Sequence, residues 1–289
     1  MKEISIIIPN LNNKERLFAC LYAVFAQIRE DVEVILVDNG STDGAKQVVN
    51  HFDVKFIEVR HPKSPYVCKN EGLKIATGNY IIFLDSNCIP HPDWLKAGLQ
   101  LLTENQADLV IGPLVYEYSN PPSKHERFDF LYSIVREEDM MHKTSLPGGN
   151  LFVRKEVIEK IGEFPEVRSK GDIIWTNKAY HAGFRLGYAK DAKVDYPAKG
   201  KEALSKKAIR LGNGAYFQWQ LARKSFDWKW YIYWLKNYLP PSPKFLMMLM
   251  QLNQRERTQL NTFQLFWLAW EFKIGLAKGM KQAMIHHAQ

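Results

Sequence analysis

Short, almost uninterrupted apolar runs alternate with helix-forming segments along the first hundred residues, and no other feature constrains the fold as strongly. We expect strands at Ile4–Ile8, Val32–Val37, Val54–Val59 and Tyr80–Leu84, and helices at Lys14–Gln27, Gly44–His51, Lys69–Ala76 and Trp94–Leu102. Strands without polar alternation are typical of a sheet that is buried on both faces. The alternation therefore predicts an α/β fold with a mostly parallel sheet and helices on both sides.

The rest of the chain divides near residue 200 into an α/β part and a helical part. In the α/β part we expect strands at Leu109–Val115, Asn150–Val153, Arg185–Ala189 and Lys193–Tyr196, helices at Lys155–Ile161 and Trp175–Ala182, and a polar, partly helical excursion over Glu117–Pro147. Helical patterns follow from Lys201 onward and are interrupted at Pro240-Pro241-Ser242-Pro243. We therefore expect one domain over residues 1–200 and a helical C-terminal region over residues 201–289.

Charge and aromatic residues are distributed unevenly between these two parts. The formal net charge of +8 combines −3 over residues 1–198 with +11 over residues 199–289, which also hold six of the eight tryptophans. Basic, aromatic helices can lie at a membrane interface that contains anionic lipids. The alternative is a helical subdomain that packs on the rest of the chain or on a second copy in a homo-oligomer. No nucleic-acid reader motif accompanies the basic residues, so nucleic-acid binding is not expected.

The sequence also bears on the compartment of the protein. No stretch reaches the roughly 20 apolar residues that a membrane span needs, and no signal peptide is visible. The cysteines Cys20, Cys68 and Cys88 are odd in number and lack CxxC spacing, which favours a reducing compartment over a disulfide framework. We expect a cytoplasmic protein, peripheral on the inner face of the plasma membrane if its basic helices bind lipid.

Polar residues follow three of the expected strands at their carboxyl ends, where open α/β sheets bind ligands. The three segments are Pro9-Asn10-Leu11-Asn12, Asp38-Asn39-Gly40-Ser41 and Asp85-Ser86-Asn87. Two carboxylates near a phosphate group normally imply a divalent cation, although Asp38 could instead accept from a ribose hydroxyl or a base N–H. Either acid could also serve only as a helix cap or turn residue. Neither GxGxxG nor GxxxxGK(S/T) occurs, which disfavours a dinucleotide enzyme and a P-loop nucleotidase.

These segments and several longer runs resemble family-2 glycosyltransferases of the GT-A fold, a Rossmann-like architecture. The resemblance covers roughly residues 3–200 and rests on five runs in family order: SIIIPNLNNKERLFACLYAVFAQ, VILVDNGSTDGA, KNEGLKIATGNYIIFLDSNCIPHPDWL, PGGNLFVRKEVIEKIGEF and KGDIIWTNKAYHAGFRLGYAKDAKV. It implies transfer of a sugar from a nucleotide-sugar, with a UDP-sugar favoured, to a glycan or lipid-linked acceptor. The family usually inverts the sugar configuration and uses Mn²⁺ or Mg²⁺.

Carried over position by position, the resemblance implies a role for each matching residue. Asp172 stands at the position of the general base. Asp85 and Asn87 stand at the ends of the DxD position and would bind the metal, and Asp38 would hold the base or the ribose. The residues expected around the nucleotide-sugar are Pro9, Asn10, Asn12, Asp38, Lys69, Asn70, Asp85, Ser86, Gly148, Gly149 and Asn150.

Three positions depart from the family pattern. Asn87 replaces the second acid of DxD, Gly171 replaces a glutamate that often precedes the base, and Tyr196 replaces a histidine that helps the metal site. The neutral amide oxygen of Asn87 still suits a hard cation, but the metal affinity should fall. We expect an active enzyme, and the alternative is a weak or inactive nucleotide-sugar-binding partner of a polysaccharide assembly.

One further run bears on whether the product is a polymer. Gln220-Leu221-Ala222-Arg223 resembles the beginning of the QxxRW motif of processive relatives, but Lys224 stands where the motif has tryptophan. Addition of a single sugar is therefore favoured over polymer synthesis.

Overall fold

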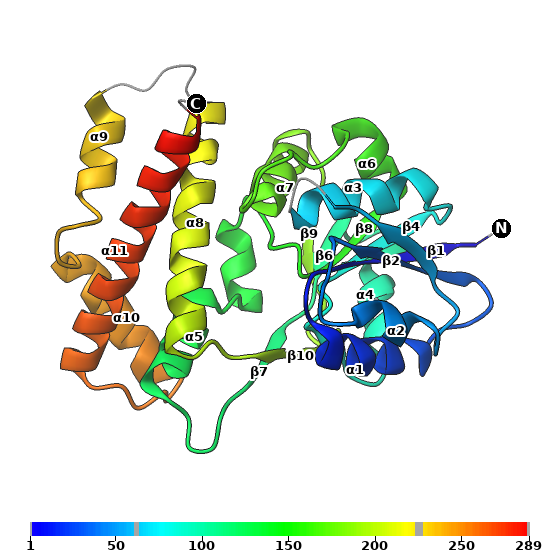
Figure 1. Ribbon diagram of the computed structural model, residues 1–289, viewed down its shortest axis with the longest axis horizontal. Helices are drawn as coiled ribbons and strands as arrows, with labels where there is room; N and C mark the ends of the chain where they lie inside the picture. Colours follow the sequence, from blue (N-terminus) through cyan, green and yellow to red (C-terminus); the bar gives the residue numbers. More distant parts are fainter. Residues whose placement is uncertain (1, 61–63, 223–227, 288–289) are drawn as a thin grey trace. The chain divides into compact units, whose positions relative to one another are not determined.

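The computed structural model describes residues 2–60, 64–222 and 228–287, and its centre is a seven-stranded sheet with the order β3-β2-β1-β4-β8-β6-β9. β1 pairs in parallel with β2 and β4, β2 with β3, and β6 with β9, whereas β8 runs antiparallel between β4 and β6. The predicted α/β fold with a mostly parallel sheet is confirmed (Figure 1). The strands are β1 (Ile4–Asn10), β2 (Val32–Asp38), β3 (Lys55–Glu58), β4 (Tyr80–Leu84), β6 (Leu109–Ile111), β8 (Asn150–Arg154) and β9 (Leu186–Tyr188).

The chain forms two units. The α/β unit contains residues 1–115, 135–166 and 171–196, and the helical unit contains residues 116–134, 167–170 and 197–289. A second, three-stranded sheet has the order β5-β10-β7. Its strands are β5 (Ile89–Pro90), β7 (Leu114–Glu117) and β10 (Val194–Pro197), and the chain passes from one unit to the other within β7 and β10.

Helices cover both faces of the large sheet (Figure 1). On one face lie α1 (Lys14–Phe25), α2 (Ala45–Val49) and α4 (Trp94–Thr103), and on the other lie α3 (Pro65–Ile75), α6 (Lys155–Ile161) and α7 (Gly171–His181). Strand pleating explains the division, because successive side chains point to opposite faces. Ile6 and Ile8 join the core beneath α1 and α4, while Ile7 meets α3 so closely that a Cβ on Gly72 would lie 2.5 Å from its Cγ2.

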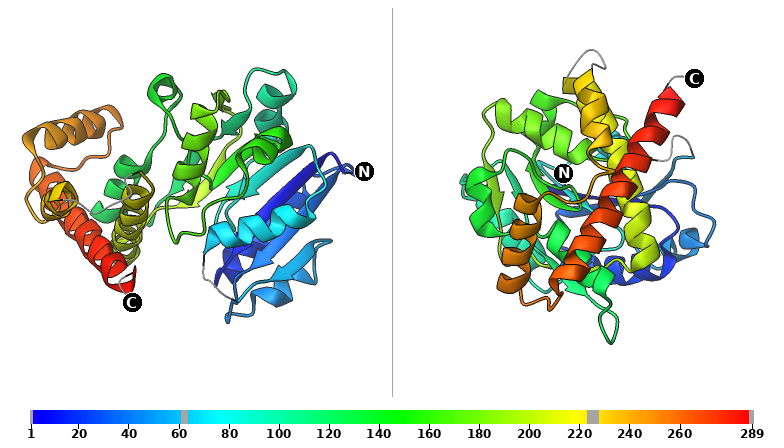
Figure 2. Two further views of the ribbon diagram at one scale, coloured as in Figure 1. Left: turned by 90° about the horizontal axis from the view of Figure 1, so that it is seen from above. Right: turned by 90° about the vertical axis from the view of Figure 1, so that its left-hand side faces the viewer.

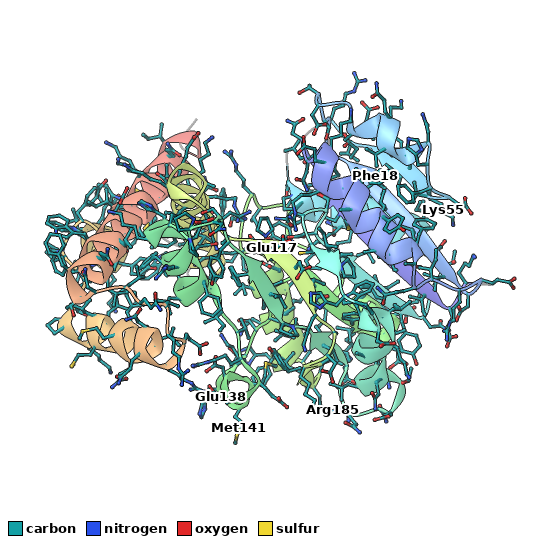
Figure 3. The ribbon with its side chains drawn as sticks, turned by 90° about the horizontal axis from the view of Figure 1, so that it is seen from below. Phe18, Lys55, Glu117, Glu138, Met141 and Arg185 are labelled. Atoms are coloured by element: carbon teal, nitrogen blue, oxygen red, sulfur yellow. The ribbon has the colours of Figure 1, made fainter. Side chains whose placement is uncertain are left out.

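Ion pairs occupy both edges of the large sheet, and two of their members are labelled in Figure 3. Lys55 of β3 donates to Glu33 of β2 at 2.5 Å, and Arg185, which precedes β9, pairs with Asp108 at 3.0 Å. Both basic side chains are about half exposed. A charged side chain on an edge strand, such as Lys55 on β3, disfavours pairing with a further chain.

Three elements begin or end at places that the apolar pattern did not predict. The expected strand Leu109–Val115 is two strands, because it is interrupted at Gly112-Pro113 and proline lacks the N–H that a ladder needs. The helix expected from Lys69 begins at Pro65, and the helix expected from Trp175 begins at Gly171. Both helices start with residues outside the apolar periodicity, and their first turns belong to the site described below.

The helical unit is built around two long helices, α8 (Lys201–Ala222) and α11 (Thr262–His287), which run side by side (Figure 2). A Cβ on Gly212 would collide with the carbonyl of Leu276, so these backbones approach where side chains are absent. A buried ion pair of 2.6 Å joins Lys207 to Asp129, and burial lowers the pKa of Lys207 against the opposing effect of that carboxylate. The other helices are α5 (Lys124–Ser133), α9 (Trp228–Leu235) and α10 (Pro243–Arg255), while the 3₁₀ helix η1 (Glu137–His142) belongs to the α/β unit.

Within the described ranges, no helix is both long enough and apolar enough to cross a membrane. The run that resembles QxxRW ends α8 at Ala222, and its Arg223, like the following Lys224, lies outside the described residues.

Candidate active site

The carboxyl ends of β1 and β2 lie side by side, because Asn10 is the register partner of Asp38. Oδ1 of Asp38 accepts from the backbone N–H groups of Gly40 and Ser41 at 3.0 and 2.7 Å, and Oδ2 accepts from Asn10 Nδ2 and Ser41 Oγ at 2.9 and 2.6 Å. A carboxylate offers about four acceptor positions. The buried carboxylate of Asp38 is therefore held by its own loop and by Asn10 of the neighbouring strand.

Asn10 has a buried acceptor that remains unused. Its Nδ2 donates to Asp38 and to Ser41, whereas its Oδ1 is buried and has no hydrogen-bond partner. Leaving such an atom unpaired costs free energy, because it has lost its water without gaining a donor. Oδ1 of Asn10 is therefore suited to an N–H or O–H group of a ligand.

Three other expected donor-site residues lie at the ends of β1 and β4. Pro9 is buried within β1, and Asn12 lies in the exposed turn after that strand. Oδ1 of Asn12 accepts from the backbone N–H of Thr42 at 2.8 Å, which joins the turns after β1 and β2. Ser86, in the turn after β4, is buried, and its Oγ accepts from Asn13 at 3.2 Å.

Asp85 and Asn87 also belong to the turn after β4. The backbone N–H of Asp85 donates to the carbonyl of Gly149 at 2.9 Å, and its side chain is 42% exposed. Asn87 is partly exposed, and its backbone carbonyl accepts from Nε of Arg16 at 3.0 Å. The turn is thus held through its backbone, and the carboxylate of Asp85 remains accessible.

Lys69 lies beneath this turn in a mostly apolar setting. Its side chain is only 3% exposed, and its Nζ donates to the carbonyl of Gly148 at 2.6 Å and lies 3.7 Å from Oδ1 of Asp85. A buried ammonium group needs such partners, because it has lost its water. Its Nζ also lies 5.5 to 5.8 Å from the ring centroids of Tyr66, Phe83 and Phe164.

Gly148 joins this lysine to Asp172. The backbone N–H of Gly148 donates to Oδ2 of Asp172 at 2.7 Å, while its carbonyl accepts from Lys69. A Cβ on Gly148 would lie 2.8 Å from Cβ of Asp172, and one on Gly149 would lie 3.0 Å from Oδ2 of Asp85. The absence of side chains at both glycines therefore lets two acids from different elements border one short segment.

Tyr66 belongs to the site although the sequence analysis did not identify it. Its hydroxyl donates to Oδ1 of Asp172 at 2.9 Å, and the residue is 4% exposed. We expected the helix to begin at Lys69, which left Tyr66 in the preceding loop. The signal for the true start was present in Ser64-Pro65, because Ser64 caps α3 by accepting from the N–H of Tyr66 and proline favours the first helical position.

Asn70 and Asn150 are buried, and the protein itself occupies both polar ends of each amide. Asn70 donates to the carbonyl of Phe164 and accepts from its N–H, both at 2.9 Å. Asn150 accepts from Nε1 of Trp94 at 2.8 Å and donates to the carbonyl of Ala192 at 2.9 Å. These contacts tie strands and loops together around the site.

The thiol of Cys68, which precedes Lys69 on α3, is buried. Burial raises the pKa of Cys68 to about 12, and the negative charge of Asp38 acts in the same direction. A thiol with such a pKa stays protonated at neutral pH, and only the thiolate attacks or binds metals well.

The residues after β4 fit a divalent cation, provided that a ligand supplies part of the coordination. A carboxylate and an amide oxygen, from Asp85 and Asn87, are hard donors of the kind that Mg²⁺ and Mn²⁺ prefer. The part of the chain that the structure describes contains no group of three or more His, Cys, Asp or Glu side chains that could hold a metal. Mg²⁺ is commonly held by one or two protein carboxylates together with substrate phosphates, and this donor set agrees with that arrangement.

Comparison with known proteins places the chain among glycosyltransferases. The sequence profile described as Glycosyl transferase family 2 matches residues 5–162. Glycosyltransferase AglE of Haloferax volcanii is 31% identical over 277 residues, which cover 92% of this chain and 91% of that protein. The pre-mycofactocin glycosyltransferase of Mycobacterium tuberculosis is 26% identical over 228 residues. The aligned region covers 74% of this chain but only about half (47%) of that relative.

Solved structures share the fold. The mannosyltransferase PcManGT from Pyrobaculum calidifontis, in complex with GDP-Man and Mn²⁺, aligns with a TM-score of 0.63 at 19% identity. The alignment covers 99% of this chain and 78% of the mannosyltransferase chain. TarS 1-349 of S. aureus aligns with a TM-score of 0.56 at 16% identity, and the alignment covers 99% of this chain and 92% of the TarS chain. The family match, the sequence relatives and the fold agree: the chain is a GT-A-fold glycosyltransferase that belongs to glycosyltransferase family 2.

Proposed function

We propose that the protein transfers one sugar, with inversion, from a nucleotide-sugar, with a UDP-sugar favoured, to a hydroxyl of a glycan or lipid-linked acceptor in polysaccharide or cell-envelope glycan synthesis. One observation carries the proposal. Two carboxylates, those of Asp85 and Asp172, border the same Gly148–Gly149 segment but have different partners. Asp85 lies beside an ammonium group, whereas Asp172 is held by neutral donors. Asp85 therefore suits the diphosphate side of the site, and Asp172 suits the acceptor side.

The reaction needs a proton acceptor and a stabilised leaving group. The acceptor oxygen forms a bond to the anomeric carbon while the bond from that carbon to the diphosphate oxygen breaks. An in-line displacement of this kind inverts the anomeric configuration. The proton of the acceptor hydroxyl passes to the carboxylate of Asp172, and the electron pair of the broken bond leaves with the nucleoside diphosphate.

The donor end of the site is formed by the carboxyl ends of β1, β2 and β4. Oδ1 of Asn10, buried and without a partner, accepts an N–H of the base or a hydroxyl of the ribose. Asp38 accepts from Nδ2 of Asn10 and so keeps that residue in place, while Gly40 and Ser41 use its other acceptor positions. Gly148 and Gly149 allow the donor sugar to approach the backbone closely.

Asp85 and Asn87 are the residues that would hold Mn²⁺ or Mg²⁺. A bound cation neutralises the negative charge that develops on the departing diphosphate. Two observations support this assignment: the exposed carboxylate of Asp85, and the presence of Mn²⁺ in the complex of the similar mannosyltransferase from P. calidifontis.

The helical unit provides the means of reaching a lipid-linked acceptor from the cytoplasmic side of a membrane. Its exposed apolar side chains include Trp228, Phe263 and Trp267, which are 66%, 71% and 47% exposed. Exposed apolar residues on a strongly basic segment are typical of helices that bind anionic membrane surfaces. Further exposed members are Tyr231, Ile232, Leu235, Leu239, Met247 and Met248.

The transfer rate and donor affinity of two variants test the catalytic proposal. Asp172→Asn should lower the rate by ~10²-fold or more with little change in donor affinity, because an amide cannot take the proton. Asparagine matches aspartate in size and can still accept from Gly148 and donate to the hydroxyl of Tyr66, but its Nδ2 then faces the N–H of Ile173, so the melting temperature of the variant is measured beside its rate. Asp85→Asn should instead weaken the binding of metal and donor together, as measured by calorimetry.

Two outcomes would contradict the proposal. If Asp172→Asn retains most of the rate, Asp172 serves only as a helix-start residue and the base lies elsewhere. If the wild-type protein binds UDP-sugars but turns over no nucleotide-sugar in the presence of Mn²⁺ and acceptor extract, the chain is a non-catalytic nucleotide-sugar-binding partner.

A further inference from the structure

The carboxylate of Asp172 is oriented by donors on both of its oxygens. Oδ1 accepts from the hydroxyl of Tyr66 and from the backbone N–H of Ile173, each at 2.9 Å, and Oδ2 accepts from the backbone N–H of Gly148 at 2.7 Å. Three of about four acceptor positions are therefore occupied. The plane of the carboxylate is fixed, and about one lone pair remains for a proton.

The ring of Tyr66 is held in place on several sides. It stacks on Phe164 with ring centroids 6.0 Å apart and an interplanar angle of 28°, and Nζ of Lys69 lies 5.8 Å from its centroid. Because the ring cannot move freely, the hydroxyl is presented to Asp172 from a fixed direction.

Gly171 provides the space for this ring. A Cβ at position 171 would lie 2.7, 2.8 and 2.9 Å from Cδ2, Cγ and Cε2 of Tyr66. These are atoms of a rigid, buried ring rather than the end of a flexible side chain, so a larger residue would displace the tyrosine. The glycine at the start of α7 and the tyrosine at the start of α3 are therefore matched, although they are 105 positions apart in the sequence.

We propose that Tyr66 is a positioning residue for the transfer reaction and that Gly171 is small because Tyr66 must reach the base. The proposal rests on the role of Asp172 as general base. Tyr66 touches neither substrate nor metal in this mechanism. Its hydroxyl holds the carboxylate so that the free lone pair meets the acceptor hydroxyl.

A purely structural role for Tyr66 makes a different prediction from a positioning role. Tyr66→Phe removes the hydroxyl and keeps the stacked ring, so the melting temperature should change little. If the hydroxyl positions the base, kcat should fall about tenfold, the cost of roughly one hydrogen bond in the transition state. The KM for the nucleotide-sugar should stay within about twofold of the wild-type value. Tyr180→Phe is the matched control, because Tyr180 lies on the same helix as Asp172 but is 42% exposed.

The double variant Tyr66→Phe/Asp172→Asn separates the two proposals. If Tyr66 acts through Asp172, its substitution should have no further effect on the residual rate of Asp172→Asn. An unchanged tenfold effect in that background would overturn the positioning role while leaving Asp172 as the base. A wild-type kcat for Tyr66→Phe together with a nearly inactive Asp172→Asn would also overturn the positioning role and leave Asp172 as the base. Full activity of Asp172→Asn would overturn both proposals.

Substitution of Gly171 provides an independent check. Gly171→Ala should lower both the melting temperature and kcat, because the added methyl group displaces the ring of Tyr66. Tyr66→Ala should itself cost stability because it removes a buried ring, but in that background Gly171→Ala should cost little more, since the ring with which the added methyl group clashes is gone. The kcat of the double variant should stay low because the hydroxyl is absent, and a wild-type kcat would show that the hydroxyl is dispensable.

Discussion

Nζ of Lys69 lies 3.7 Å from Oδ1 of Asp85 and 2.6 Å from the carbonyl oxygen of Gly148, although the lysine side chain is only 3% exposed. The α/β unit therefore places an ammonium group directly beneath the turn that we propose holds the metal. This charge favours a diphosphate at the site and stabilises the carboxylate that faces it. It also anchors the glycine segment to which Asp172 is bonded.

Loss of this charge should destabilise the protein. Lys69→Met keeps the apolar stem but leaves the buried carbonyl of Gly148 without a donor, and we expect a loss of about 2 kcal/mol in the free energy of unfolding. Urea denaturation measures it. Lys74→Met, on the same helix, removes an exposed partner of Glu71 and should change the stability little. Equal stability of the two variants would show that Lys69 has no anchoring role.

The neutral ligand in the turn after β4 makes a prediction about metal binding. If Asn87 binds the cation, Asn87→Asp should tighten Mn²⁺ binding and lower the Mn²⁺ concentration for half-maximal rate, because it adds a negative charge. Titration of the transfer rate with Mn²⁺ measures this. Asn79→Asp, at the other end of β4, is the control and should not alter the metal dependence. An unchanged metal dependence of Asn87→Asp would count against Asn87 as a ligand.

Exposed aromatic residues at the start of α11 should contribute to membrane binding. Phe263 and Trp267 have ring centroids 5.9 Å apart, and both are exposed. Phe263→Ser/Trp267→Ser should reduce co-sedimentation with vesicles that contain phosphatidylserine, and added salt should weaken the binding of the wild-type protein.

The matched control for this surface is Phe18→Ser/Tyr22→Ser on α1, where both side chains are also exposed. It should leave vesicle binding unchanged. If the wild-type protein sediments with neither anionic nor neutral vesicles, the apolar surface of the helical unit has another partner.

Acid should destabilise the α/β unit through Glu33. Burial alone would raise the pKa of this carboxyl group, but hydrogen bonds from Lys55, Ser5 and Thr77 outweigh it and hold the pKa at about 2, below its usual value of 4.5. A lowered pKa stabilises the fold above pH 4.5, and this contribution is lost as the pH falls from 4.5 to about 2.

The variant Glu33→Gln should show this dependence. At pH 7 it should lose about 2 kcal/mol in the free energy of unfolding, and its difference from the wild type should shrink as the pH approaches 2. Chemical denaturation at a series of pH values measures both quantities. Glu58→Gln, which removes an ion pair with the well-exposed Arg60, serves as the control. A difference that stays constant with pH would mean that Glu33 titrates alike in the folded and unfolded states.

Local patterns were sufficient for most of the fold. Apolar runs identified the strands of the large sheet because both of its faces are buried. The runs end at Ile8, Val37 and Leu84, shortly before Asn10, Asp38 and Asp85. Parallel pairing brings the ends of neighbouring strands together, so these polar residues could be assigned to one edge before any coordinates were known. The starts of α3 and α7 were predicted four residues too late, because capping residues rather than apolar periodicity determine where a helix begins.

The sequence alone therefore determined the individual strands, most of the helices and the polar strand ends, since these depend on residues near one another in the chain. Tertiary structure decided which polar atoms remain available to a ligand. Tyr66 and Asp172 are 106 positions apart, and Lys69 and Gly148 are 79 apart. No local pattern records such pairs, because each depends on how the helices and loops pack over the sheet. The same packing occupies both ends of the Asn70 amide and leaves Oδ1 of Asn10 without a partner.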